Sequence, residues 1–122
     1  MSLRILVVDA SLTLREMLRQ TLTEAGFTVT LAEDGLDALD RLADAPPDLV
    51  LTELALPRLD GLGLLAAIRS GSVAPFVPIV VLTADCTATA QDRARAAGAS
   101  GMIIKPFDEA ALVESLRRFA AG

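Results

Sequence analysis

The chain has 122 residues, 52% of them hydrophobic, and a formal net charge of −5. This composition excludes a disordered chain, which would be polar, and the negative charge argues against nucleic acid as a direct ligand. No apolar run approaches the roughly 18 residues that a membrane span needs. The sequence contains no histidine, which excludes histidine-based zinc sites, Ser-His-Asp triads and a phosphohistidine carrier.

The length predicts a single domain over residues 1–122, because one hydrophobic core usually serves about one to two hundred residues. The single cysteine allows no disulfide framework and fits a reducing cytoplasm. We therefore expect a cytoplasmic domain, monomeric or weakly dimeric, that contacts neither nucleic acid nor a membrane.

The first half of the chain alternates short apolar runs with helical patterns. Residues 4–9 are apolar through their middle, which predicts a strand covered on both faces. Leucines at helical spacing over residues 14–22 predict a helix that Gly26 ends. Residues 27–32 predict a second strand, and residues 35–45 predict a helix that stops before two prolines.

The second half of the chain continues this alternation with three more strands and three more helices. Strands are predicted at residues 49–52, 79–83 and 102–104. Helices are predicted around residues 64–68, before Gly98, and after Asp108, which is a typical N-cap residue.

Five strand–helix units with short connections predict an α/β fold in which helices cover both faces of a parallel sheet. At this length we expect a flavodoxin-like (βα)5 doubly wound sandwich with strand order 2-1-3-4-5. In that arrangement a ligand site lies at the carboxyl ends of the strands, where the order reverses between strands 1 and 3.

Four polar side chains are predicted at this edge of the sheet. Strands 1 and 3 end in the carboxylates Asp9 and Glu53, strand 4 ends in Thr83, and strand 5 ends in Lys105. Polar residues are common at strand ends, so each alone carries little weight. Lys105, however, is the only lysine, while every other basic residue is arginine. A compact ammonium kept at one place favours a point-charge role that the planar guanidinium fills poorly.

Five segments of the chain resemble the receiver domain of bacterial two-component response regulators. They lie at residues 5–9, 32–39, 56–61, 81–84 and 105–107, with the sequences ILVVD, AEDGLDAL, LPRLDG, VLTA and KPF. The resemblance covers almost the whole chain, and residues 97–101 are most similar to single-domain chemotaxis regulators.

The resemblance implies a phosphorylation site. Receivers of this family take a phosphoryl group from a phosphohistidine kinase onto an Asp at the end of strand 3, with Mg²⁺ held by acids at the end of strand 1. A lysine holds the phosphoryl oxygens, and a Thr or Ser of strand 4 reports their presence. Asp9, Thr83 and Lys105 match this pattern.

Three positions depart from the family pattern. Ala10 stands where a second acid should bind the metal, Glu53 stands at the phosphoacceptor position, and Met102 stands where a switch aromatic is usual. Mg²⁺ prefers a near-octahedral set of oxygen ligands, and only two carboxylates, those of Asp9 and Glu53, remain here. We therefore expect no metal and no cofactor in this site.

Glu53 is longer than Asp by one methylene, which moves its carboxylate by about 1 Å. An in-line attack tolerates little misplacement, and the longer side chain is instead predicted to reach Lys105. Three outcomes follow for the domain. Glu53 mimics a bound phosphoryl group, or the pocket is inert without a conformational bias, or Glu53 retains residual phosphorylation.

The expected function is that of an atypical receiver that binds protein partners independently of phosphorylation and is not an enzyme. The alternative is a working receiver that accepts a phosphoryl group from a histidine kinase with Mg²⁺, against which Ala10 and Glu53 both count. A flavin-binding protein would need a glycine-rich phosphate loop at residues 10–14, which contain no glycine. A haloacid-dehalogenase-type phosphatase would need an Asp where Ser11 stands.

The resemblance also implies a partner surface made by helix 4, strand 5 and helix 5, with Met102 inside the contact. Methionine suits such a surface because its side chain adapts to a partner without one required rotamer. Four arginines are expected to form a positive rim on this face, or else only to solvate two helices: Arg93, Arg95, Arg117 and Arg118.

Overall fold

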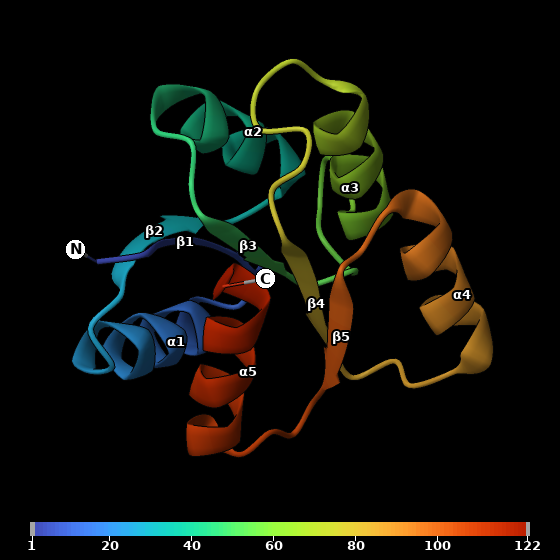
Figure 1. The fold of residues 1–122 in the computed structure, drawn as a ribbon. Coiled ribbons are helices and arrows are strands. Elements are labelled where there is room, and N and C mark those ends of the chain that lie inside the picture. The colour runs from blue at the N-terminus through green and yellow to red at the C-terminus, as the bar shows by residue number, and fades with distance from the viewer. Residues whose placement is uncertain (1, 122) are drawn as a thin grey trace.

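The structure is a computed structural model that describes residues 2–121 as five strands and five helices in strict alternation (Figure 1). The strands are β1 (Arg4–Val8), β2 (Thr28–Ala32), β3 (Leu49–Thr52), β4 (Ile79–Thr83) and β5 (Gly101–Ile104). The helices are α1 (Leu12–Glu24), α2 (Gly35–Asp44), α3 (Gly61–Ser70), α4 (Ala88–Ala97) and α5 (Glu109–Ala121).

All strand pairs are parallel, and the sheet has the order β2-β1-β3-β4-β5, which confirms the predicted flavodoxin-like topology. Helices α1 and α5 cover one face, and α2, α3 and α4 cover the other (Figure 1). Successive side chains of a strand point to opposite faces of the sheet. Because helices cover both faces, the central strands are apolar along their whole length. No helix within residues 2–121 is long and apolar enough to cross a membrane.

The core consists of two layers that the sheet separates. Val50 and Val81 face the layer formed with α2, α3 and α4, while Leu51 and Leu82 face the layer formed with α1 and α5. The largest fully buried side chains are all aliphatic, in keeping with the low aromatic content of 3%.

The helix ends are set by local hydrogen bonds. The predicted cap Asp108 accepts a hydrogen bond from the Ala111 amide at 2.9 Å, in the first turn of α5. The second strand begins at Thr28 instead of the predicted Phe27, because the Phe27 amide donates back to the Leu22 carbonyl at 3.0 Å. This bond closes the C-terminus of α1 around Gly26, whose φ of +97° suits glycine.

Candidate functional site

The four polar residues predicted at the strand ends lie together in the structure. The Lys105 ammonium Nζ is 2.6 Å from Glu53 Oε2 and 3.2 Å from Asp9 Oδ2. Thr83 is buried at the end of the neighbouring strand β4. The predicted contact between Glu53 and Lys105 is thereby confirmed.

Backbone pairing brings these residues to one edge of the sheet. Val8 of β1 pairs with Thr52 of β3, so the residues that follow them, Asp9 and Glu53, leave the sheet side by side. The Lys105 amide donates to the Thr83 carbonyl at 2.9 Å, which brings the ends of β4 and β5 together. The parallel register therefore gathers four residues that are far apart in the sequence.

The Glu53 carboxylate uses both oxygens. Oε2 accepts from Lys105, while Oε1 accepts from the backbone amides of Leu54 at 2.8 Å and Ala55 at 3.4 Å. Burial is the largest influence on the pKa of Glu53 and raises it. The hydrogen bonds from Lys105, Thr83 and Leu54 and the charge of Lys105 outweigh burial, so the pKa lies below its ordinary value. Glu53 is thus a firmly held carboxylate at neutral pH.

Lys105 is the positive centre of the pocket. Burial is the largest single influence on its pKa and lowers it, but the hydrogen bond to Glu53 and the charges of Asp9 and Glu53 together raise the pKa above its ordinary value. Two carboxylates and one ammonium leave a local net charge of −1. The ammonium therefore already neutralises half of the negative charge that would attract a cation.

A divalent metal does not fit the donors that are present. Ala10 offers a methyl group where the resemblance implies a carboxylate ligand. Asp9 and Glu53 both point to the Lys105 ammonium, and Asp9 Oδ1 also accepts from the Ser11 amide at 2.9 Å. Within residues 2–121, no group of three acidic, cysteine or histidine side chains is placed to hold a metal ion. Mg²⁺ is usually bound through one or two carboxylates, and both carboxylates that remain here are paired with the Lys105 ammonium.

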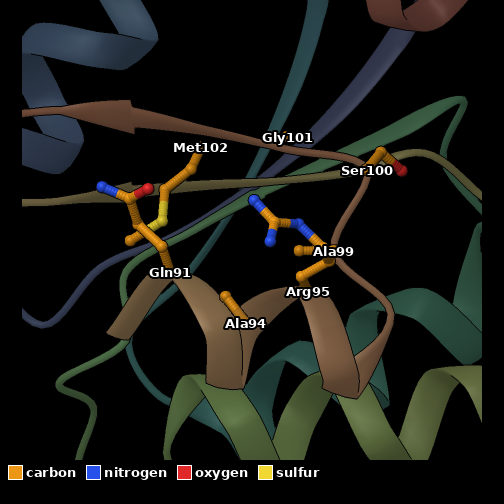
Figure 2. A pocket seen from close by; sticks show the side chains of 7 residues that line it. All are labelled: Gln91, Ala94, Arg95, Ala99, Ser100, Gly101 and Met102. Carbon is orange, nitrogen blue, oxygen red and sulfur yellow. The ribbon is translucent and has the colours of Figure 1, made fainter. Parts of the chain in front are cut away.

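Met102 lies on the edge strand β5, as predicted, and borders a cavity between β5 and α4 (Figure 2). The Met102 side chain extends from the strand toward Gln91 of α4, and the Arg95 guanidinium extends from α4 back toward the strand (Figure 2). The cavity has a volume of about 170 Å³. Methionine is unbranched and flexible, so its side chain can adapt to the shape of this cavity.

The four arginines predicted to form one positive rim do not do so. Arg117 donates to the Ala25 carbonyl at 2.7 Å and lies over the Phe27 ring, on the side of α1. Arg95 lines the Met102 cavity, while Arg93 lines a different hollow beside Leu54 and Ala55. Of the two expectations for these arginines, the single rim is not observed, because helical residues one or two positions apart point in different directions, and the solvation of two helices stays open.

An ion pair next to the pocket was not predicted. Arg58, in the loop between β3 and α3, makes two hydrogen bonds to Asp34 at 2.8 and 3.0 Å. Both residues belong to segments of the family resemblance, but their separation of 24 residues in the chain gives no local signal of a contact. Such a pair becomes visible only once the two loops are placed in space.

Comparisons with known proteins agree with this architecture. The chain matches the response regulator receiver domain family over residues 5–117. It is 42% identical to the response regulator MprA of Mycobacterium bovis over an alignment of 121 residues. The alignment covers 99% of this chain and 50% of MprA. The chain thus spans about half the length of the curated relatives that it matches.

Two solved structures are also similar. The chemotaxis response regulator CheY4 of Vibrio cholerae superposes with a TM-score of 0.92 and 32% identity, covering 98% of this chain and 99% of that one. The receiver domain of the sensor histidine kinase PA1611 of Pseudomonas aeruginosa superposes with a TM-score of 0.92 and 29% identity, with full coverage of both chains. That receiver holds a magnesium ion coordinated in its active-site cleft.

Proposed function

This chain belongs to the response regulator receiver domain family, and on that premise we propose that it is an atypical receiver that binds protein partners without being phosphorylated. Receiver domains are signalling modules of two-component systems, which interact with histidine kinases and effectors. In this chain the carboxylate of Glu53 takes the place of a phosphoryl group. The domain acts in the cytoplasm and performs no catalysis of its own.

The observation that carries this proposal is the 2.6 Å contact between Glu53 and Lys105. In the family, the lysine at this position holds phosphoryl oxygens, so an anion that already occupies it acts like a permanent ligand. Thr83, which reports the phosphoryl group in the family, contributes to the lowered pKa of Glu53. A fixed negative charge at this place supports constant, rather than switched, signalling.

The donor set further supports a metal-independent role. Ala10 lacks the oxygen that would bind a divalent ion, and the two remaining carboxylates are paired with Lys105. A phosphoryl transfer would need the acceptor oxygen, the metal and the donor in line, and a misplacement of about 1 Å can cost about a hundredfold in rate. The longer Glu53 and the missing ligand both act against this geometry.

Phosphorylation can be tested by intact mass after incubation with acetyl phosphate and Mg²⁺. We expect no stoichiometric gain of a phosphoryl group in the native chain. The double variant A10D/E53D should gain one group, because Thr83 and Lys105 are already in place. A10D alone, which restores the metal ligand but keeps Glu53, is the matched control and should stay unlabelled. Stoichiometric labelling of the native chain would contradict the proposal and favour a working receiver.

The partner surface proposed here is the face of α4, β5 and α5 around Met102. The cavity beside Met102 is large enough for one apolar side chain of a partner, and Arg95 at its wall favours an acidic segment beside that side chain. Met102→Asp and Arg95→Glu should therefore each abolish the capture of partners from native cells. Arg117→Glu is the control, because Arg117 faces α1. Equal capture by all three variants would exclude this face.

A further inference from the structure

The loop between β3 and α3 contains a strained three-residue turn. The Leu59 amide donates to the Pro57 carbonyl at 2.7 Å, and Arg58 between them has a φ of +64°. A hydrogen bond between residues i and i+2 around a positive φ is rare, and it is unfavourable for a residue with a Cβ atom. Contacts outside the turn must hold this conformation.

One such contact is the ion pair between Arg58 and Asp34. Arg58 Nε donates to Asp34 Oδ2 at 2.8 Å, and Arg58 Nη2 donates to Oδ1 at 3.0 Å, so the pair is bidentate. The Asp34 carboxylate is buried and is itself fixed, because it also accepts from the Asp37 amide at 2.8 Å as the N-cap of α2. Arg58 is therefore tied to a rigid support rather than to a mobile side chain.

Two glycines allow the loop to lie close to its neighbours. The Gly35 amide donates to the Leu59 carbonyl at 3.1 Å, and a Cβ atom at Gly35 would overlap that carbonyl oxygen. The Gly61 amide donates to the Leu54 carbonyl at 2.8 Å, and a Cβ atom there would overlap the Glu53 carbonyl. Backbone hydrogen bonds thus hold the loop at Leu54 and at Leu59, and the ion pair holds Arg58, the residue before Leu59.

The same loop orients the carboxylate of Glu53. Oε1 of Glu53 accepts from the amides of Leu54 and Ala55, the two loop residues that follow it, and Oε2 faces Lys105. If the two amides move, Oε1 loses its donors and the carboxylate is free to rotate away from Lys105. The position of the loop therefore determines the geometry of the charged pair.

We infer that Arg58 is a positioning residue, whose ion pair with Asp34 holds the β3–α3 loop so that the Leu54 and Ala55 amides fix Glu53 against Lys105. The arrangement keeps the pocket in one state without a bound ligand. This inference does not rest on the proposed signalling role, because it concerns the geometry of the Glu53–Lys105 pair and is measured on that pair.

The chain offers a direct probe of this pair, since Lys105 is its only lysine. The experiment uses the full chain and measures the pKa of Lys105 from the ¹³Cε signal, together with hydrogen exchange of the Leu54 and Ala55 amides. The variants are Arg58→Ala and Arg58→Gly. Arg58→Gly removes the ion pair but relieves the strain of the turn, so it stays folded if Arg58→Ala does not.

The matched control is Arg41→Ala, which breaks the exposed pair of Arg41 with Asp37 on α2 at 3.3 Å. In each folded Arg58 variant the pKa of Lys105 should fall toward its ordinary value, and the two amides should exchange several-fold faster. The control should match the native chain in both measurements. A Lys105 pKa and amide exchange that are unchanged in a folded Arg58 variant would overturn the inference, as would equal shifts in the Arg41 control.

Discussion

The interior of the sheet and its carboxyl edge are both shielded from solvent, but different interactions hold them. In the interior, Val50, Leu64 and Leu65 are fully buried among aliphatic side chains only. At the edge, Asp9 and Glu53 are exposed by only 4% and 9%, and they are held by charge and hydrogen bonds. Among the described residues, no buried side-chain nitrogen or oxygen lacks a hydrogen-bond partner.

This contrast explains how a receiver can change the residues of its pocket and keep its fold. The interior tolerates changes that preserve apolar volume, whereas the edge tolerates changes that leave its buried charged groups paired and hydrogen-bonded. Ala10 and Glu53 alter the number and position of carboxylates without touching a core side chain. The two regions therefore vary independently, and the following substitutions measure how far that independence extends.

The largest effect is expected in the interior. Leu64→Ala should lower the free energy of unfolding by about 2–5 kcal/mol, because it removes buried methyl groups and leaves a cavity under the sheet. Urea denaturation followed by circular dichroism measures this, since the chain lacks Trp and Tyr. Leu36→Ala is the control, because Leu36 is 43% exposed. Equal losses in both variants would mean that burial does not distinguish the two sites.

Removing the ammonium at the edge should have the next largest effect. Lys105→Met leaves the carboxylates of Asp9 and Glu53 close together without their cation, and should cost about 1–3 kcal/mol at pH 7. Arg19→Met breaks the exposed pair with Glu16 and should cost about 0–1 kcal/mol. If Lys105→Met is as stable as the native chain, the edge does not depend on charge balance.

The pH dependence of stability should identify Glu53 as a source of this effect. At pH 7 the native chain should exceed Glu53→Gln in stability by about 1 kcal/mol, because the variant keeps the shape and loses the charge. The pKa of Glu53 is lowered by folding, so this contribution is complete above the ordinary value of 4.5 and is lost as the pH falls through the lowered folded value.

The difference in stability between the native chain and Glu53→Gln should also shrink at high pH. The pKa of Lys105 is raised by folding, so the contribution of the ammonium is complete below the ordinary value of 10.5 and is lost as the pH rises through the raised folded value. Urea midpoints of both proteins across this pH range provide the measurement. A stability difference that does not change with pH would show that Glu53 contributes through packing and not through charge.

The sequence predicts the sheet and the residues at its strand ends, but not the contacts between loops. The strand order and the meeting of Asp9, Glu53, Thr83 and Lys105 follow from periodicity and parallel pairing, which are local rules applied repeatedly. The pair of Arg58 with Asp34 does not follow, because it joins two loops and depends on a positive φ at a residue that is not glycine. Loop conformations of this kind arise from tertiary contacts that no local pattern encodes.

The sequence pattern also does not predict the direction in which each arginine side chain points. Arg117 and Arg118 are neighbours in the chain, yet Arg117 contacts the Ala25 carbonyl and Arg118 lines a hollow beside Phe119. The two adjacent arginines predict positive charge in the second half of α5, but only the rotation of the helix against the sheet decides which surface receives each charge. The prediction of one positive rim failed at this step.

The smallest effect is expected at Met102, where the interior and the surface meet. Val81 of β4 pairs with Met102 of β5, but Val81 is fully buried while Met102 borders the cavity of about 170 Å³. Val81→Phe should cost about 1–3 kcal/mol or more, because extra volume in a filled layer forces neighbouring side chains out of their rotamers. Met102→Phe should change the free energy of unfolding by less than about 1 kcal/mol, because the cavity accepts the ring. Denaturation of both variants under the same conditions compares two positions that are one strand apart. A loss at Met102 as large as that at Val81 would mean that the cavity closes around methionine and that β5 packs like an interior strand, which would remove the space that the proposed partner contact needs.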